Sequence, residues 1–178
     1  MKNFATAAAL LLALLLSVPQ HAYARRADDS RQAIEAVIEA FRTTIIRRDV
    51  PGFLSLFLHE DITWVGVYTD GTVERHNAGL ADPGAPRRIK ISGGTPRKFI
   101  ERIAQGPESR TETISNVRID TDGDVAQVWF DYSFLIGDYK NNWGKESWQL
   151  VRTSDGWKIA AVTWSSEENP VQRANSRN

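Results

Sequence analysis

The 178-residue chain contains no cysteine. This absence excludes a disulfide framework, a catalytic thiol and any thiolate metal site. Histidine is also scarce, and only His59 and His76 follow the first two dozen residues. A metal site would need more converging ligands than His76, Glu74 and scattered acids provide. We therefore expect no metal ion and no cofactor.

An excess of charge of either sign is also missing. The sequence has 22 basic and 22 acidic residues, and its formal net charge is zero. Nothing in this balance favours a nucleic-acid partner or an anionic membrane surface. We expect the protein to bind neither.

A long apolar run is absent as well, but a short one opens the chain. Lys2 precedes an apolar segment over residues 7–18, and Ala22-Tyr23-Ala24 fits the small-x-small pattern of a signal-peptidase site. A run of this length is too short to span a bilayer, which needs about 20 residues. We predict a signal peptide over residues 1–24, with an uncleaved membrane anchor as the alternative.

Cleavage would leave no stable membrane anchor and would place the mature protein in the periplasm or outside the cell. Removing residues 1–24 from the 178 leaves 154 residues, enough for one domain with a proper core. We predict that this domain spans residues 25–166. Residues 167–178 are polar and are predicted to form a flexible tail.

Aromatic residues are plentiful, with six Trp, four Tyr and seven Phe. A secreted domain without disulfides is held together by packing, and these side chains suit that role. Three of the tryptophans lie within residues 146–164, where two strand-like segments flank Asp155-Gly156. This dipeptide is a strong signal for a tight hairpin. A hairpin so rich in large rings closes a sheet over an apolar layer, either helices or a cavity.

The first half of the chain carries three helical patterns. An apolar stripe at three- and four-residue spacing predicts a helix through about residue 47. Asp49-Val50-Pro51 begins a second helix through about residue 58, and Thr95-Pro96 begins a third that ends before Gly106. Between them we predict a strand over 62–68, a turn at Asp70-Gly71 and a long loop over 69–95, with a short strand near 88–91.

The second half predicts long antiparallel strands. Turn signals separate four segments, at residues 111–120, 125–136, 143–153 and 157–165. In the second segment Phe130, Tyr132 and Phe134 share one face, which should look toward the helices, whereas Gln127 and Trp129 share the other face.

This order of elements resembles the nuclear transport factor 2-like superfamily, in its SnoaL-like and ketosteroid-isomerase-like branches. The resemblance covers residues 30–166. It is carried by the helical pair that ends in His59-Glu60-Asp61-Ile62-Thr63-Trp64 and by the closing Asp155-Gly156-Trp157-Lys158-Ile159. It implies an α+β fold, in which a strongly curved antiparallel sheet forms a cone around three helices of the N-terminal half and leaves an internal pocket. Because members include enzymes and binding proteins, the fold does not select a function.

The isomerase branch needs a general-base aspartate on the first strand, with a tyrosine and a protonated aspartic acid as oxyanion donors. Counting from Asp49, the resemblance places the base position at Val65 and the tyrosine position at Phe41. Counting back from the hairpin turn, it places the acid at Trp148. None of these three side chains can transfer a proton. The dehydratase branch works through paired histidines, which this chain does not supply.

Seven residues are the site candidates. Phe41, Trp64, Tyr132, Trp148 and Trp164 could line an aromatic ligand pocket, although plain core packing is the alternative for each ring. Tyr132 needs a partner for its hydroxyl within or near the cavity. Glu146 could share the inward face with Trp148, where burial would raise its pKa, or could lie exposed at an edge. We treat Tyr132, Glu146 and the loop residue His76 as weak catalytic candidates.

Two functions follow, and one geometric fact separates them. The first is a secreted or periplasmic module that binds a small apolar or aromatic molecule, as a homodimer through the outer sheet face that carries Trp129. The second is an isomerase, dehydratase or cyclase that acts on a small cyclic apolar substrate by general acid–base catalysis. A carboxylate or imidazole close to the Tyr132 hydroxyl would favour the enzyme. An interaction domain with a filled cavity is a third possibility.

Overall fold

The computed structural model describes residues 26, 28–82, 84–171 and 173. The predicted leader over residues 1–24 lies outside this range, as does half of the predicted tail. Within the described residues, no helix is both long enough and apolar enough to cross a membrane.

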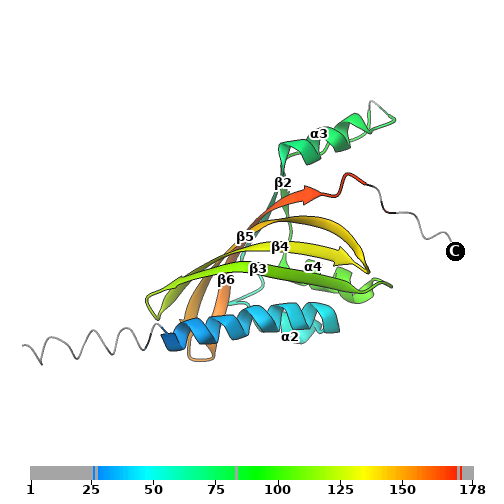
Figure 1. Cartoon of the computed structure of the whole chain (residues 1–178). Coiled ribbons are helices and arrows are strands. Elements are labelled where there is room, and N and C mark those ends of the chain that lie inside the picture. The colour runs from blue at the N-terminus through cyan, green and yellow to red at the C-terminus, as the bar shows by residue number, and fades with distance from the viewer. Residues whose placement is uncertain (1–25, 27, 83, 172, 174–178) are drawn as a thin grey trace, which may run out of the picture.

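A six-stranded sheet forms the larger layer of the molecule. Its spatial order is β2-β1-β6-β5-β4-β3, and neighbours run antiparallel except for β1, which is parallel to β6. Figure 1 shows that the sheet is strongly curved and does not close into a barrel. The strands are β1 (Thr63–Tyr68), β2 (Ile91–Gly93), β3 (Arg110–Thr121), β4 (Val125–Ile136), β5 (Tyr139–Thr153) and β6 (Gly156–Glu168).

Helices from the N-terminal half cover the concave face of this sheet (Figure 1). They are a first helix over residues 28–47, α2 (Val50–Leu54) and α4 (Pro96–Gln105). Asp49 caps α2 by accepting a hydrogen bond from the Gly52 amide at 2.9 Å, and Thr95 caps α4 by accepting from the Lys98 amide at 3.2 Å. The predicted α+β cone is therefore confirmed.

The core lies between the helices and the sheet and is largely aromatic. Phe41 of the first helix packs against Phe53 of α2 and Trp148 of β5, with ring centroids 5.0 Å and 4.9 Å apart. Phe130 of β4 meets Trp148 edge-on at 5.1 Å. These rings are fully buried, so the absence of disulfides is offset by packing across the two layers.

The prediction of a long loop over residues 69–95 was wrong. Residues 70–78 form the helix α3 (Asp70–Ala78), which stands off the rest of the molecule beyond the end of the sheet (Figure 1). The Asp70-Gly71 pair begins this helix, because Thr69 accepts a hydrogen bond from the Thr72 amide and caps it. The short strand of this region is β2, at 91–93 instead of 88–91.

Two element ends also differ from the predictions. α2 ends at Leu54, because Phe57 leaves the helix to form a parallel bridge with Ile159 of β6. β6 continues through Glu168, so the first two residues of the predicted tail belong to the sheet. The Glu168 amide donates to Thr72 Oγ1 at 3.0 Å, which ties this end of the strand to α3.

Candidate active or binding site

The concave face of the sheet carries a row of residues centred on Glu146. Glu146 of β5 lies opposite Phe130 of β4 on one side and opposite Trp164 of β6 on the other. Trp164 in turn lies opposite Gly66 of β1. Glu146 is only 5 % exposed and points inward, as one of the two sequence alternatives proposed. Its Oε1 accepts a hydrogen bond from Trp148 Nε1 at 2.6 Å.

Gly66 is needed for the position of the Trp164 ring. A Cβ atom at Gly66 would lie 2.7 Å from two ring atoms of Trp164 and 2.6 Å from Ser92 Oγ. Such distances are shorter than van der Waals contact, so only a residue without a side chain allows the indole to lie against β1.

A second buried carboxyl, Glu112, was missed by the sequence predictions. It lies on β3 opposite Phe134 of β4 and is 4 % exposed. Its Oε1 is buried and has no hydrogen-bond partner among the described residues. An unpaired buried polar atom costs about 1–3 kcal/mol, so this oxygen can gain free energy from a hydrogen-bond donor.

Tyr132 lies between the two carboxyls. It occupies the middle position on β4, two residues from the Phe134 that faces Glu112 and two from the Phe130 that faces Glu146. Diagonal neighbours of this kind are about 7–8 Å apart on a sheet, within reach of long side chains. The sheet therefore brings two acids and a phenol onto one stretch of its concave face.

The Tyr132 hydroxyl is oriented by a local opening between β5 and β6. Tyr132 Oη donates to the Ser165 carbonyl at 2.9 Å. This carbonyl oxygen lies 2.1 Å from where a Cβ atom of Gly144 would be, so it can turn inward only because residue 144 is glycine. The Lys145 amide, which loses a strand partner there, donates to Ser165 Oγ at 3.0 Å. The Tyr132 proton is thus directed at the protein backbone.

Burial dominates the electrostatics of the site. Desolvation raises the pKa of Glu146 to about 7, against the hydrogen bond from Trp148, which lowers it. Desolvation and the nearby Glu146 carboxyl raise the pKa of Glu112 well above its usual range, and Arg42 acts in the opposite direction. Desolvation also raises the pKa of Tyr132, with smaller contributions from both glutamates. The pair therefore retains protons that solvent-exposed glutamates would lose.

An aromatic cluster extends from the row toward β1 and α4. Trp64 of β1 meets Trp164 edge-on at 5.4 Å and lies 5.5 Å from Phe99 of α4. Phe99 lies 6.0 Å from Phe134. Phe99, Phe134 and Trp164 are only partly buried, so this side of the core is the one closest to solvent.

The structure therefore gathers six of the seven sequence-predicted candidates on the concave side. Phe41, Trp64, Tyr132, Trp148 and Glu146 are all buried there, and Trp164 is partly buried beside them.

The histidines lie elsewhere. His76 is on α3, which stands away from the concave face, and His59 is exposed between α2 and β1. Across the described part of the chain, no three His, Asp or Glu side chains are grouped so that they could hold a metal ion.

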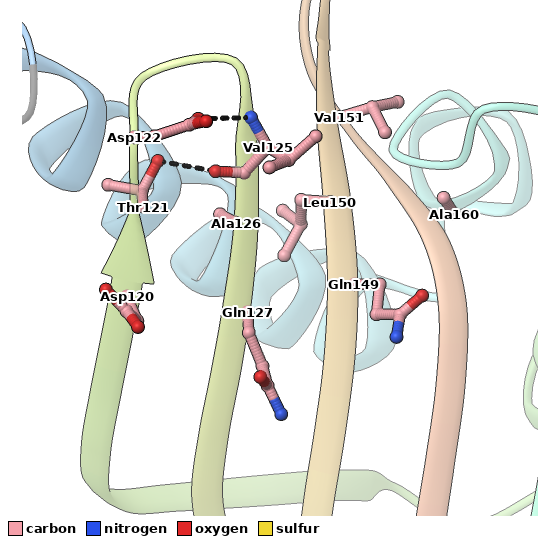
Figure 2. Close-up of a pocket in the computed structure, with 10 residues that line it drawn as sticks. All are labelled: Asp120, Thr121, Asp122, Val125, Ala126, Gln127, Gln149, Leu150, Val151 and Ala160. Atoms are coloured by element: carbon pink, nitrogen blue, oxygen red, sulfur yellow. Dashed lines mark hydrogen bonds between the residues drawn. The ribbon is translucent and has the colours of Figure 1, made fainter.

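A shallow hollow of about 540 Å³ lies on the opposite face of the sheet, away from the helices (Figure 2). The side chains of Gln127 and Gln149, which lie directly opposite each other on β4 and β5, form part of its lining. Asp122 closes the nearby turn by accepting from the Val125 amide at 3.0 Å (Figure 2). A second hollow lies at the C-terminal end of α4. Neither is the predicted internal pocket, which stays a prediction.

No protein-family model and no curated protein matches the sequence. Solved structures do match the fold. An NTF2-like protein of unknown function from Pseudomonas putida KT2440 aligns with a TM-score of 0.55 at 14 % identity, over 80 % of this chain and 89 % of that one. The chain has the NTF2-like fold.

Other NTF2-like structures of similar likeness carry names of enzymes. A protein of the NTF2-like family from Streptomyces avermitilis, provisionally assigned as a dehydratase, aligns with a TM-score of 0.50 at 18 % identity, over 79 % of this chain and 98 % of that one. A Novosphingobium aromaticivorans protein, provisionally assigned as an aromatic ring hydroxylase, aligns at 0.53 and 18 % identity, over 79 % and 94 %. At these identities the likeness concerns the NTF2-like fold alone.

Proposed function

We propose that this protein binds a small, mostly apolar cyclic molecule that carries a hydrogen-bond donor, on the concave face of its sheet. The unpaired, buried Oε1 of Glu112 is the observation that supports this most directly. Aromatic rings next to it supply apolar contact, and the carboxyl supplies the polar contact that fixes orientation. As a part of this proposal, the protein acts in the periplasm or outside the cell, where the predicted signal peptide would direct it.

Entry of the ligand requires movement of side chains. Both carboxyls are buried, at 4 % and 5 % exposure. The partly buried rings of Phe134 and Trp164 lie opposite Glu112 and Glu146 on neighbouring strands, and Phe99 packs against Phe134. Rotation of these rings would admit a flat molecule of two rings without disturbing the fully buried core around Phe41 and Trp148.

A matched pair of probes tests the proposal. 2-Naphthalenemethanol has a hydroxyl that can donate to Glu112, whereas 2-(methoxymethyl)naphthalene presents a similar shape without a donor. We expect the alcohol to bind at least tenfold more tightly by isothermal titration calorimetry, a difference of about 1.4 kcal/mol. The preference should shrink in Glu112→Leu, which removes the acceptor, and persist in Asp131→Asn, a control carboxyl on the outer face. Equal affinities for the two probes, or no binding of either, would contradict the proposal.

The inward position of Glu146 supports a second candidate, general acid–base catalysis. A carboxyl whose pKa is raised to about 7 can exchange protons near neutral pH. An enzyme would be favoured by a carboxylate close to the Tyr132 hydroxyl. Glu146 does point inward, but the Tyr132 hydroxyl donates to Ser165 and not to a carboxylate. We therefore rank binding first.

Catalysis has its own test. In 2-tetralone dissolved in heavy water, a base removes a proton from the carbon beside the carbonyl, and deuterium replaces it. NMR measures this exchange directly. If Glu146 is the base, added protein accelerates the exchange with a rate that rises through about pH 7, and Glu146→Gln abolishes the acceleration. Exchange at the buffer rate would remove this second candidate and leave the binding proposal intact.

A further inference from the structure

In the part of the chain that the structure describes, no cationic side chain is bonded to either buried carboxyl. Among the described residues, no hydrogen bond or ion pair joins the carboxyl of Glu112 or Glu146 to a basic side chain. Arg42 is the nearest candidate, but its Nη1 pairs with Glu39 at 2.6 Å and its Nε donates to the backbone carbonyl of Glu112 at 3.3 Å. Its guanidinium acts on the pair only at a distance.

The other titratable groups near the pair add no positive charge. Tyr132 lies between the carboxyls from β4, and Tyr68 acts on Tyr132 from β1. Among the described residues, Arg42 is the cation that lowers the pKa of Glu112, and Glu146 has no cation that acts on it in this way. If both carboxyls ionise, the interior holds two negative charges against one remote positive charge, which is costly at low dielectric.

Aromatic rings surround the positions where a compensating cation would sit. Glu146 is flanked across the strands by Phe130 and Trp164, and Glu112 by Phe134. Trp64 extends the ring cluster beyond Trp164. A cation within about 6 Å of a tryptophan face is attracted by the ring, most strongly when both are desolvated. Carboxyls and ring faces together form a chemically suitable site for an organic ammonium ion.

We infer that the ligand of this site is an aromatic or cyclic amine, bound as its ammonium form between the Glu112–Glu146 pair and the rings of the concave face. This inference rests on the proposed function and narrows it from hydrogen-bond donors in general to cations. The ammonium hydrogens would donate to Glu112 Oε1, and the positive charge would favour ionisation of the pair.

Proton release is the consequence that sets this inference apart. In the protein without ligand, burial raises the pKa of both carboxyls, so the pair holds more protons near neutral pH than two exposed glutamates would. A bound ammonium ion stabilises the ionised form, so binding expels a proton. By linkage, the affinity for an amine then rises with pH, by up to tenfold per unit while one proton is released, until the free amine itself loses its charge. A neutral ligand has no such dependence.

The experiment compares 2-naphthylmethylamine with 2-naphthalenemethanol, which has the same rings and a neutral donor. We expect the amine to bind at least tenfold more tightly at pH 8, and its advantage to fall toward pH 5. Calorimetry in two buffers of different ionisation enthalpy should show release of close to one proton for the amine and none for the alcohol.

Two isosteric variants test whether the carboxyl pair causes the tight binding of the amine and the release of the proton. Glu112→Gln and Glu146→Gln should each reduce the affinity for the amine by tenfold or more, and should reduce proton release. Asp131→Asn, on the outer face where Asp131 pairs with Lys145, should leave both unchanged. Circular dichroism checks that each variant is folded, and the pH dependence of the unmodified protein gives a readout that needs no variant.

The outcomes separate this inference from the proposed function. If the alcohol binds and the amine binds no more tightly at any pH, the cation inference is wrong while the binding proposal stands. If the amine binds tightly but releases no proton, the carboxyl pair is not its receptor and the inference also fails. If neither probe binds, both proposals fail together.

Discussion

At the scale of single residues, the unusual feature of this protein is a pair of acids in an aromatic interior. Glu146 has a hydrogen-bond donor in Trp148, whereas Oε1 of Glu112 has none. Burying carboxyls disfavours their charged form, so each holds its proton more tightly in the folded chain than in the unfolded one. The pair is therefore a cost in stability that grows with pH, and a ligand can offset it.

This cost predicts how stability depends on pH. The unfolded chain releases the Glu146 proton near pH 4.3, whereas the folded chain releases it near pH 7. Because the folded state binds more protons within this window, Glu146 lowers the stability as pH rises through it, by about 1.4 kcal/mol per unit. Glu146→Gln should remove this loss, so that its stability relative to the unmodified protein increases from pH 4.5 to 7.5 in urea unfolding.

Asp131 provides a control, because its pKa is shifted in the opposite direction to that of Glu146. Hydrogen bonds from Asn116 and Lys145 lower the pKa of this outer-face carboxyl. The ionised Asp131 therefore stabilises the folded protein above the pKa it has in the unfolded chain, and this stabilisation is lost as pH falls. Asp131→Asn should therefore lose its effect at low pH, where Glu146→Gln also has the least effect. Parallel pH curves for Glu146→Gln and the unmodified protein would show that Glu146 ionises normally.

One of these two acids could be predicted from the sequence and the other could not. Glu146 lies two residues from Trp148 on a regularly alternating strand, so the inward face was readable. On β3 the alternation breaks, because Asn116 has a positive φ of 54° and the pairing shifts between Ser115 and Arg118. Counting outward from Ile119 would place Glu112 on the wrong face, since an irregular pairing reverses the parity of the strand.

At the scale of elements, the opening between β5 and β6 positions Tyr132. The inward carbonyl of Ser165 depends on the missing side chain at Gly144. We predict that Gly144→Ala destabilises the protein by about 1–3 kcal/mol, because the methyl group must displace the β6 backbone. Thermal unfolding measures this, and Tyr132 should lose its hydrogen bond to Ser165.

Gly93→Ala is the matched control for that change. Gly93 also lies in a strand, and no atom lies within 4 Å of the position its Cβ would take. This substitution should be neutral or slightly stabilising. Equal effects of the two substitutions would show that crowding at Ser165 is not the cause.

The α3 element shows what periodicity cannot reveal. It has no apolar stripe, and its buried residue is Thr72. An apolar pattern is the main sequence signal for a helix, so this segment was interpreted as a loop. Polar contacts hold α3 in place. Two come from β6, nearly a hundred residues away, where Thr72 accepts from the Glu168 amide and Arg75 pairs with Glu167. Others come from the segment before β2, where Asp70 pairs with Lys90 and Asn77 bonds to the Arg88 backbone.

Thr72→Val should therefore loosen α3 alone. Valine keeps the shape of threonine but removes the hydroxyl that accepts from the Glu168 amide at 3.0 Å. Leaving the Glu168 amide without an acceptor costs about 1–3 kcal/mol, and this loss weakens the contact between α3 and the end of β6. Hydrogen exchange should become faster in α3 and at Glu168, with the core of β4 and β5 unchanged. Thr163→Val, an exposed position on β6, is the control, and unchanged exchange in α3 would contradict the assignment.

At the scale of the whole molecule, the order of elements was sufficient to predict the NTF2-like cone. The helical stripe, the Asp155-Gly156 hairpin and the strand alternation each have short-range causes, so they could be read locally. The state of the interior could not, because it depends on which side chains meet across strands distant in sequence, as Glu112 and Glu146 do. Homodimerisation likewise depends on side chains that the fold brings together on its surface.

The outer face of the sheet leads to the final prediction. Trp129 is 43 % exposed and Val125 is 55 % exposed, next to the hollow lined by Gln127 and Gln149. An exposed tryptophan beside uncharged amides is typical of an interface, and a two-fold contact would bury this patch on both copies. We predict a homodimer through this face in sedimentation velocity at micromolar concentration.

Substituting Trp129→Lys should convert this dimer to a monomer, because two lysines would meet near the two-fold axis with their charges desolvated. Val117→Lys is the matched control. Val117 is 40 % exposed, but it lies on the edge strand β3 at the irregular pairing, so the dimer should persist. A monomeric unmodified protein, or a dimer that survives Trp129→Lys and dissociates with Val117→Lys, would place the contact elsewhere. Because the concave face is not involved, ligand affinity should be the same in the monomeric variant.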